Sequence, residues 1–190
     1  SRAETRVRNL LDVVTDLIKV SRLRSVSQPA YDPDPVNLAH LADAVLEIFS
    51  STAQEKGLRL IRRVGQVQLD GNRDALEELL VNLVDNAVKY TPSGGTVTVV
   101  TRAEGPEAVL VVHDTGIGIE SDALGDVFDE FFRTERARRH DRTGTGIGLA
   151  IVKRVVDMYG GTIHIRSQPD QGTAVTVRLP RSRGHLEFRA

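Results

Sequence analysis

The chain has 190 residues, of which 40% are hydrophobic and 27% are charged, with a formal net charge of −1. These values describe a globular protein large enough to bury a core, with no overall electrostatic attraction to nucleic acid or to an anionic membrane. The absence of cysteine excludes disulfides, cysteine metal sites and thiol nucleophiles and fits a reducing compartment, and no apolar run approaches the roughly 18 residues of a membrane span.

The first predicted element is an amphipathic helix from Glu4 to about Leu23, within an N-terminal part formed by residues 1–25. Its apolar residues repeat at three- and four-residue spacing, as Val7, Leu10, Leu11, Val14, Leu17 and Ile18. The proline-containing segment 26–36 is predicted to be a linker. The apolar seam could pack on the chain's own domain, but a helix beyond a linker needs another surface, which favours a dimerisation arm. Because the chain begins with Ser1 rather than Met, we expect it to be a fragment.

Residues 37–180 are predicted to form one domain, followed by a basic tail at 181–190 that we expect to be disordered. Asn37 caps a helix that extends to about Lys56 and ends at Gly57, and a second helix begins at Asn72 or Asp74 and ends before Pro92. The other expected helices are a weak one at 123–128 and a helix at 149–159. The expected strands are 58–63, 66–69, 96–102, 108–113, 162–166 and 173–179. Because helices and strands segregate, we predict an α+β fold with a mostly antiparallel sheet covered on one face by helices.

The helix that ends before Pro92 has two contrasting faces. Its apolar stripe consists of Leu76, Leu79, Leu80, Leu83, Val84 and Ala87. Glu78, Asn82, Asn86 and Lys89 fall on the opposite face. Asparagine is a mediocre helix former, and Glu or Lys would solvate this face at lower cost. Two asparagines one turn apart, followed by a lysine, therefore indicate a face that holds a ligand.

Two glycine-rich segments are candidate binding loops. Residues 144–148, G-T-G-I-G, open a helix, where backbone N–H groups favour a phosphate, although a simple helix-starting turn is a nearly equal alternative. Residues 114–118, D-T-G-I-G, follow an apolar strand. They could form an Asx-turn with a purely structural role, or they could present a carboxylate to an amino group on a planar ring. The segment at 144–148 does not match the Rossmann fingerprint, because Leu149 stands where a glycine is required, and no P-loop motif occurs in the chain.

Four blocks in order carry a family resemblance over residues 36–180. They are N-x-x-D-N-A-x-K-Y-T at 82–91, D-T-G-I-G-I at 114–119, F-D-E-F-F-R-T at 128–134 and G-T-G-I-G-L-A at 144–150. This sequence of blocks resembles the ATP-binding domain of sensor histidine kinases. The resemblance implies the Bergerat fold, a two-layer α/β sandwich shared with gyrase, MutL and heat-shock chaperones, in which ATP lies between the helical layer and a mobile lid.

The resemblance also implies residue roles. Asn86 would bind Mg²⁺ with Asn82 beside it, and Lys89 would reach the phosphates. Amide oxygens are suitable ligands for a hard cation, and phosphoryl transfer depends mainly on positioning the reactants and neutralising their charge. Tyr90, Asp114, Gly116, Gly118, Ile119 and Thr173 would surround the adenine. Phe128, Phe131 and Phe132 would seat the lid, and Arg133 would reach the γ-phosphate. The phosphate tail would lie against Gly144, Thr145, Gly146, Ile147, Gly148 and Leu149. Asn82, Lys89 and Arg133 are the implied catalytic residues.

One departure from the hydrolysing relatives concerns Asn82, where they place a glutamate as general base. An amide cannot accept that proton at neutral pH, so the sequence favours transfer over hydrolysis. The family's nucleophile is a histidine on a dimerisation helix, in a motif resembling H-E-[LF]-[RK]-T-P. The chain has five histidines, and none of them stands in such a motif: His40, His113, His140, His164 and His185. We therefore expect the acceptor helix to be missing from this chain.

The resemblance implies further partners and a location. The full-length protein would form a homodimer through the N-terminal helix, and its other partners would be the phosphoacceptor helix and a response regulator. The chain would lie in the cytoplasmic portion of a bacterial sensor. Two rival functions remain open, an anti-sigma-type serine kinase and a nucleotide-binding module that transfers no phosphate. Most of the arginines of the segment 133–142 are interpreted as part of a solvated loop. Nucleic-acid binding is disfavoured because few aromatic residues are interleaved with them and the chain has no net positive charge.

Overall fold

The structure is a computed structural model, and it describes residues 35–141 and 144–182. The predicted helix at Glu4–Leu23 lies outside the described residues, as do most of the predicted linker and tail. Those predictions therefore remain predictions.

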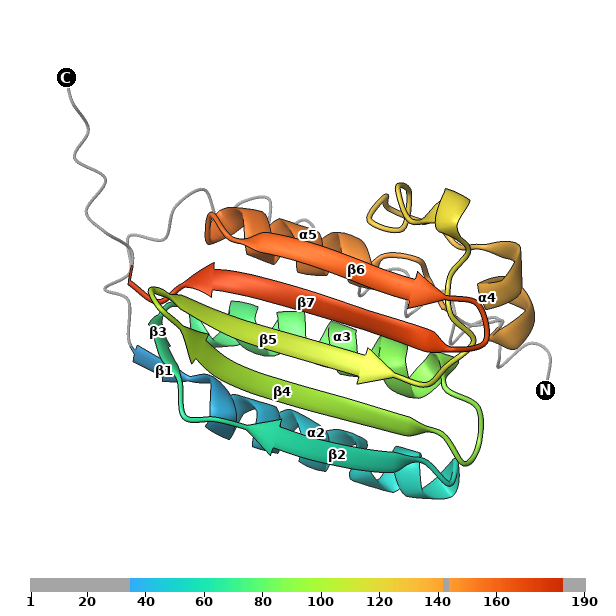
Figure 1. The fold of residues 1–190 in the computed structure, drawn as a ribbon, viewed down its shortest axis with the longest axis horizontal. Helices are drawn as coiled ribbons and strands as arrows, with labels where there is room; N and C mark the ends of the chain where they lie inside the picture. The colour runs from blue at the N-terminus through green and yellow to red at the C-terminus, as the bar shows by residue number, and fades with distance from the viewer. Residues whose placement is uncertain (1–34, 142–143, 183–190) are drawn as a thin grey trace.

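The described chain forms a five-stranded sheet with helices on one face (Figure 1). The strand order is β2 (Arg59–Val64), β4 (Thr96–Glu104), β5 (Glu107–Asp114), β7 (Gly172–Pro180), β6 (Thr162–Gln168). Only the β2–β4 pair is parallel in this sheet. The helical layer consists of α2 (Leu38–Glu55), α3 (Arg73–Tyr90) and α5 (Gly148–Met158). The predicted α+β sandwich is confirmed.

The core lies between the sheet and the helices. Alternate residues of the central strands point into it, such as Val97, Val99, Leu110, Val112, Val175 and Val177, and all are buried. The predicted apolar stripe of α3 packs against them, with exposed fractions of 0 to 3% for the six residues from Leu76 to Ala87. The opposite face of α3 is half-buried, including Asn82, Asn86 and Lys89. The contrast between the two faces that the sequence predicts is therefore present.

Side-chain caps fix where two of the helices begin. The Asn37 side chain accepts hydrogen bonds from the N–H groups of Ala39 and His40, and that of Asn72 accepts one from Ala75 N. These bonds satisfy donors that the first helical turn leaves unpaired. Asn72, rather than Asp74, is therefore the cap of α3.

Three local elements differ from the sequence prediction. A short strand β1 (Pro35–Asn37) pairs with β3 (Gln68–Asp70), where a linker was predicted up to residue 36. The helix predicted at 123–128 is wrong, because only a 3₁₀ turn at Ser121–Ala123 forms, with no side-chain cap and with Gly125 soon after it. Conversely, α4 (Glu135–His140) forms where a polar loop was expected.

Candidate functional site

A cavity of about 440 Å³ lies between α3, the start of α5, the sheet and the segments 120–141 and 144–146, which together we call the lid. Most of the predicted site residues line it: Asn86, Lys89, Tyr90, Asp114, Gly118, Ile119, Phe132, Arg133, Gly144, Thr145, Gly146, Gly148, Leu149 and Thr173. Residues far apart in the sequence thus converge on one pocket of a size typical for a small-molecule site.

Three predicted site residues lie just outside this lining. Asn82 donates from Nδ2 to Glu78 O at 2.7 Å, and a Cβ on Gly148 would lie 3.0 Å from Asn82 Oδ1. Asn82 therefore abuts the first residue of α5. Ile147 is fully buried in the core, and Gly116 supports the site through its backbone N–H.

Asp114 is held in place at the end of β5 by backbone amides. Its Oδ1 accepts hydrogen bonds from Gly116 N at 2.8 Å and from Thr173 N at 3.3 Å. Burial raises the pKa of Asp114 to about 6, although the two amide bonds act in the opposite direction. With Oδ1 occupied, Oδ2 is the oxygen with which Asp114 would accept a hydrogen bond from a ligand.

Glycines next to Asp114 permit close contacts between backbones. Gly118 has φ +70°, and a Cβ on it would lie 2.1 Å from Gln168 O. A Cβ on Gly172 would lie 1.9 Å from Asp114 O. Any side chain at either position would force the segments apart. In this structure the two glycines therefore let the loop after β5 pack on the β6–β7 turn, which fixes the wall of the cavity.

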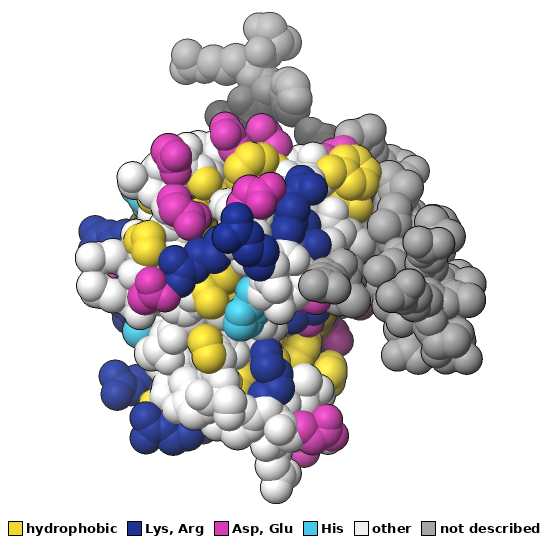
Figure 2. All heavy atoms as spheres, turned by 90° about the vertical axis from the view of Figure 1, so that its right-hand side faces the viewer, with side chains coloured by type: hydrophobic (Ala, Val, Ile, Leu, Met, Phe, Trp, Pro, Cys, Tyr) yellow, Lys and Arg dark blue, Asp and Glu magenta, His cyan; other side chains and the backbone are white. Residues whose placement is uncertain are grey.

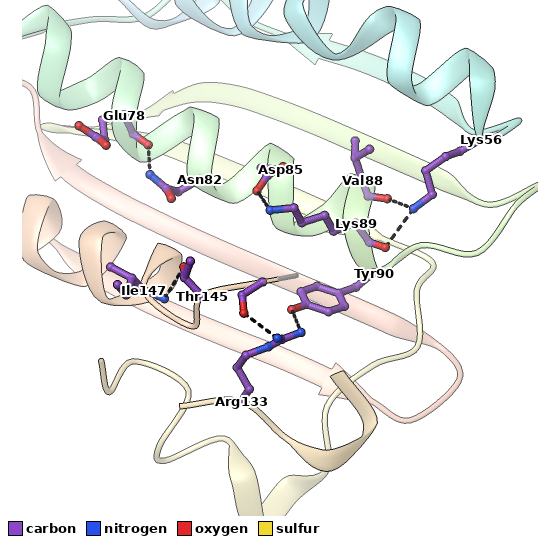
Figure 3. A network of polar contacts seen from close by, with 11 residues as sticks. Lys56, Glu78, Asn82, Asp85, Val88, Lys89, Tyr90, Arg133, Thr145 and Ile147 are labelled. Atoms are coloured by element: carbon purple, nitrogen blue, oxygen red, sulfur yellow. Dashed lines mark hydrogen bonds and ion pairs between the residues drawn. The ribbon is translucent and has the colours of Figure 1, made fainter. Parts of the chain in front are cut away.

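On α3, Lys89 forms an ion pair with Asp85, one helical turn earlier, at 2.6 Å (Figure 3). Burial alone would lower the pKa of Lys89, but the charge and hydrogen bond of Asp85 raise it. Lys89 is thus charged, and its ammonium group lies beside the pocket. Asp85 lines the pocket too, and sequence reasoning missed it, although the i,i+4 spacing to a lysine on a helix was a usable signal.

Arg133 binds lid backbone with its guanidinium group. Nη1 donates to Gly144 O at 2.6 Å, and Nη2 donates to the carbonyls of Ala137 (3.2 Å) and Asp141. Nη2 also lies 3.5 Å from the Tyr90 hydroxyl (Figure 3). Its Nε is buried and has no hydrogen-bond partner among the residues the structure describes. Arg133 thus ties α4 and the start of the glycine loop together next to the cavity.

The lid also contacts the end of α3. His140 Nε2 lies 3.2 Å from Lys89 O, and the same carbonyl accepts from Lys56 Nζ at 3.0 Å. Lys56 Nζ donates to Val88 O as well, at 2.6 Å. Sequence reasoning had assigned no contact to Lys56, although a lysine at a helix end is a common partner for carbonyls.

The outer surface of the lid is rich in basic side chains. Figure 2 views the end of the molecule that carries α4 and shows Lys and Arg side chains gathered across that face. Within the lid, Arg138, Arg139 and Phe131 are exposed. Phe131 has φ +67°, and its N–H donates to Gly146 O at 3.0 Å, whereas Phe132 lines the cavity. Of the two aromatics, only Phe132 therefore faces the binding space.

Residues 71–183, more than half of the chain, match the sequence profile of histidine kinase-, DNA gyrase B- and HSP90-like ATPases. The chain belongs to this ATPase family. The match covers α3, both glycine loops and the lid, so most of the residues that line the cavity lie within the matched ATPase domain.

Relatives narrow this assignment to the histidine kinases. The chain is 34% identical to a sensor-like histidine kinase of Rhizobium meliloti, over 90% of this chain and 33% of that protein. It spans only 33%, 21% and 23% of the lengths of the first three curated relatives it matches. This ATPase domain therefore corresponds to a part of much longer proteins.

Solved structures agree with the sequence matches. The mycobacterial sensor histidine kinase MprB is 32% identical with a TM-score of 0.68, over 80% of this chain and 99% of that chain. Full-length ShkA in complex with AMPPNP is 29% identical with a TM-score of 0.76, over 90% of this chain and 35% of that chain. The described residues thus form an ATP-binding catalytic domain of the histidine kinase type. Within residues 35–141 and 144–182, no helix is long and apolar enough to cross a membrane.

Proposed function

We propose that this chain binds Mg·ATP and transfers the γ-phosphate to a histidine on a dimerisation helix of the full-length protein. One observation carries the proposal: a single cavity is lined by a fixed carboxylate, Asp114, by the ammonium group of Lys89 and by the N-terminus of α5. The carboxylate of Asp114 suits the amino group of adenine, and Lys89 with the N-terminus of α5 suits phosphates. That ShkA was solved with AMPPNP supports a nucleoside triphosphate as the ligand.

The donor atoms around α3 fit a magnesium ion. Asn86 and Asp85 both line the cavity, and their side chains carry oxygen atoms, the ligands that Mg²⁺ prefers. No cluster of three or more His, Cys, Asp or Glu residues that could hold a metal occurs in the described part of the chain. A magnesium ion would therefore take Asn86 as its protein ligand and the phosphates and water as the others. When bound, it would neutralise phosphate charge.

The carboxylates of the cavity favour transfer over hydrolysis. Among the described residues, Asp85 and Asp114 are the only carboxylates in its lining. Asp85 is paired with Lys89, and Asp114 is the proposed partner of the adenine, so we propose neither as a general base for water at the γ-phosphate. Asn82 cannot serve either, because its amide is not basic.

The proposed role of Lys89 and Arg133 is to bind and orient the triphosphate. Lys89 would exchange Asp85 for phosphate oxygens, and the buried Nε of Arg133 offers one further donor. The amides of residues 144–148 would bind the phosphate tail at the start of α5. Tyr90 and Phe132 would pack on the adenine and seat the lid.

The organisation of the whole protein is likewise proposed. Residues 1–25 would belong to the second dimerisation helix and 26–34 to the linker, which β1 shortens. The full-length protein would be a homodimer in the cytoplasmic portion of a bacterial sensor and would pass the phosphoryl group to a response regulator. A relative of the same fold, ThkA, was solved in complex with the response regulator protein TrrA.

The test is an ATP titration of the purified chain with and without Mg²⁺, followed by a measurement of free phosphate over hours. Saturable, Mg²⁺-sensitive binding with almost no phosphate release is the expected result. Steady phosphate release would assign the chain to the hydrolysing branch of the family, and absence of binding would overturn the proposal. Binding that persists unchanged without Mg²⁺ would favour a nucleotide-binding module that transfers no phosphate.

A further inference from the structure

The hydroxyl of Ser167 lies where three backbone segments meet beside Asp114. Its Oγ accepts a hydrogen bond from Ile119 N at 2.8 Å and donates one to Gly172 O at 2.9 Å. It also lies 2.8 Å from Thr173 Oγ1. Ile119 and Thr173 line the cavity, whereas Ser167 stands behind them. Ser167 can therefore act on a ligand only through its neighbours.

A count of protons fixes the direction of the contact between Ser167 and Thr173. A serine hydroxyl has one proton and two lone pairs. The Gly172 carbonyl can only accept, so it takes the proton, and the Ile119 N–H uses one lone pair. The contact with Thr173 must use the second lone pair. Thr173 therefore donates its only hydroxyl proton to Ser167, and its oxygen can offer a ligand nothing but lone pairs.

Thr173 and Asp114 stand side by side. They are register partners in the β5–β7 pair, and Thr173 N donates to Asp114 Oδ1 at 3.3 Å. The cavity thus presents two neighbouring acceptors, a carboxylate oxygen and a hydroxyl oxygen whose proton is already used. An exocyclic amino group has two N–H donors and satisfies both. A carbonyl oxygen in the same place would face two acceptors and lose its own hydrogen bonds.

We propose that Ser167 is a positioning residue that sets the hydrogen-bond polarity of Thr173 and so makes the cavity select 6-aminopurines over 6-oxopurines. The inference rests on the proposed function, because it places the base of a nucleotide beside Asp114. It adds a specificity-determining residue that does not itself touch the base.

The test compares ATP with inosine triphosphate, which differs at position 6 and in the N1 proton, by calorimetric titration of the full chain and its Ser167→Ala variant. Loss of the serine hydroxyl frees the Thr173 proton, which can then turn toward the 6-oxo group. The preference for ATP over inosine triphosphate should fall by about tenfold, the effect of one hydrogen bond. Ser167→Thr keeps a hydroxyl and should leave the preference within about twofold, which makes it the matched control.

A second variant separates this role from a purely structural one. Thr173→Val removes the acceptor, and in that background Ser167→Ala should not change the preference further. If Ser167→Ala instead weakens both nucleotides by the same factor, Ser167 only supports the fold and the inference is wrong. If the wild-type chain binds ATP without preferring it, the inference also fails while the proposed function stands. If the wild-type chain binds neither nucleotide, the proposed function itself is overturned.

Discussion

At the scale of single residues, the site depends on ionisable side chains whose position or charge is maintained by their neighbours. Asp114 is 8% exposed and stays in place because two amides bind one of its oxygens. Lys89 stays charged in a half-buried position because Asp85 lies one turn away. In both cases a buried or half-buried charge has been retained where a ligand would need it, and such residues are typical of functional sites.

Asp114→Asn should weaken ATP binding and leave the fold intact. An asparagine can keep the amide bonds of Oδ1 through its own oxygen, but it would replace the acceptor Oδ2 with an NH₂ donor. We expect a loss of at least tenfold in affinity, measured by titration calorimetry. Asp85→Asn is a useful comparison, because it acts at the phosphate end and should leave the selection of the base unchanged. Equal ATP affinity in wild type and Asp114→Asn would remove Asp114 from the site.

The raised pKa of Asp114 has a consequence for stability. The folded state holds the proton up to pH about 6, whereas the ordinary pKa of a free aspartate carboxyl is 3.8. The folded state therefore binds more protons between these values, so stability falls as pH rises from 3.8 to about 6 and then stays lower. The loss is on the order of 2–3 kcal/mol. The asparagine of the Asp114→Asn variant is never charged. The variant should therefore lack this pH-dependent loss of stability and be more stable than the wild type near pH 7.

This pH dependence can be measured by urea unfolding of both proteins between pH 4 and pH 8, roughly spanning the two pKa values. The informative quantity is the difference between the two unfolding free energies, since other titrating groups act on both proteins alike. A difference that stays constant over this range would show that Asp114 is not destabilised by burial.

At the scale of helices and strands, the sequence predicted elements with a regular apolar pattern and missed elements defined by distant partners. α3 was recovered with its two faces, because six apolar residues repeat along one side and Asn72 caps it. β1 was missed because only its pairing with β3 makes three residues a strand. α4 was missed because it has no apolar face, although Thr134 accepts from Ala137 N and basic residues fill its last turn.

The same distinction holds for the site. The motif residues of α3 could be placed from the sequence because they lie on the polar face of a regular amphipathic helix, and the glycine loops could be placed because one follows a strand and the other opens a helix. The sequence could not predict the contacts of Ser167, of Lys56 or of Arg133 with the lid, because the partners of these side chains are backbone atoms that only folding brings together. Side chains that hold backbone in place leave little trace in a single sequence.

A lid contact supplies the prediction at this scale. Arg136 in α4 forms an ion pair with Asp170 in the β6–β7 turn, and Asp170 N donates to Ile117 O at 2.8 Å. The pair thus joins the lid to the loop after Asp114. A partly exposed pair contributes only about 0–1 kcal/mol to folding, so its effect should appear in lid opening. We expect Arg136→Ala to raise the dissociation rate of a fluorescent ATP analogue a few-fold in stopped-flow experiments, with little change in melting temperature.

The matched control is Arg139→Ala. Arg139 pairs with Glu135 inside α4 at 3.4 Å and does not bridge to the sheet. Its removal deletes the same charge from the same helix, so it should leave the dissociation rate unchanged. If both variants accelerate dissociation equally, the effect comes from net charge, and the bridge to Asp170 has no role in holding the lid.

At the scale of the whole molecule, one core fixes both ends of the cavity. α3 and α5 pack on the sheet whose strands β5 and β7 carry Asp114 and Thr173, so the residues proposed to bind adenine and those proposed to bind phosphate belong to one packed unit. The lid adds further contacts, through Lys89 O and the Tyr90 hydroxyl, at the end of α3. A ligand that fills the cavity would thus bind helices, sheet and lid at once, and it would bind the unfolded chain at none of these places.

ATP should therefore stabilise the whole domain by mass action. At a concentration of 100 times its dissociation constant, a ligand specific for the folded state adds about 2.7 kcal/mol, which corresponds to roughly 5–10 °C in melting temperature for a chain of this size. Asn86 is the proposed protein ligand of Mg²⁺, so part of this shift should require Mg²⁺ in the wild type. In Asn86→Ala the melting temperature with ATP should be the same with and without Mg²⁺, because the ion then has no protein ligand through which to add affinity. A Mg²⁺-dependent shift of equal size in both proteins would place the metal on other oxygens, with Asp85 the first to test, since its carboxylate lines the same cavity one residue away.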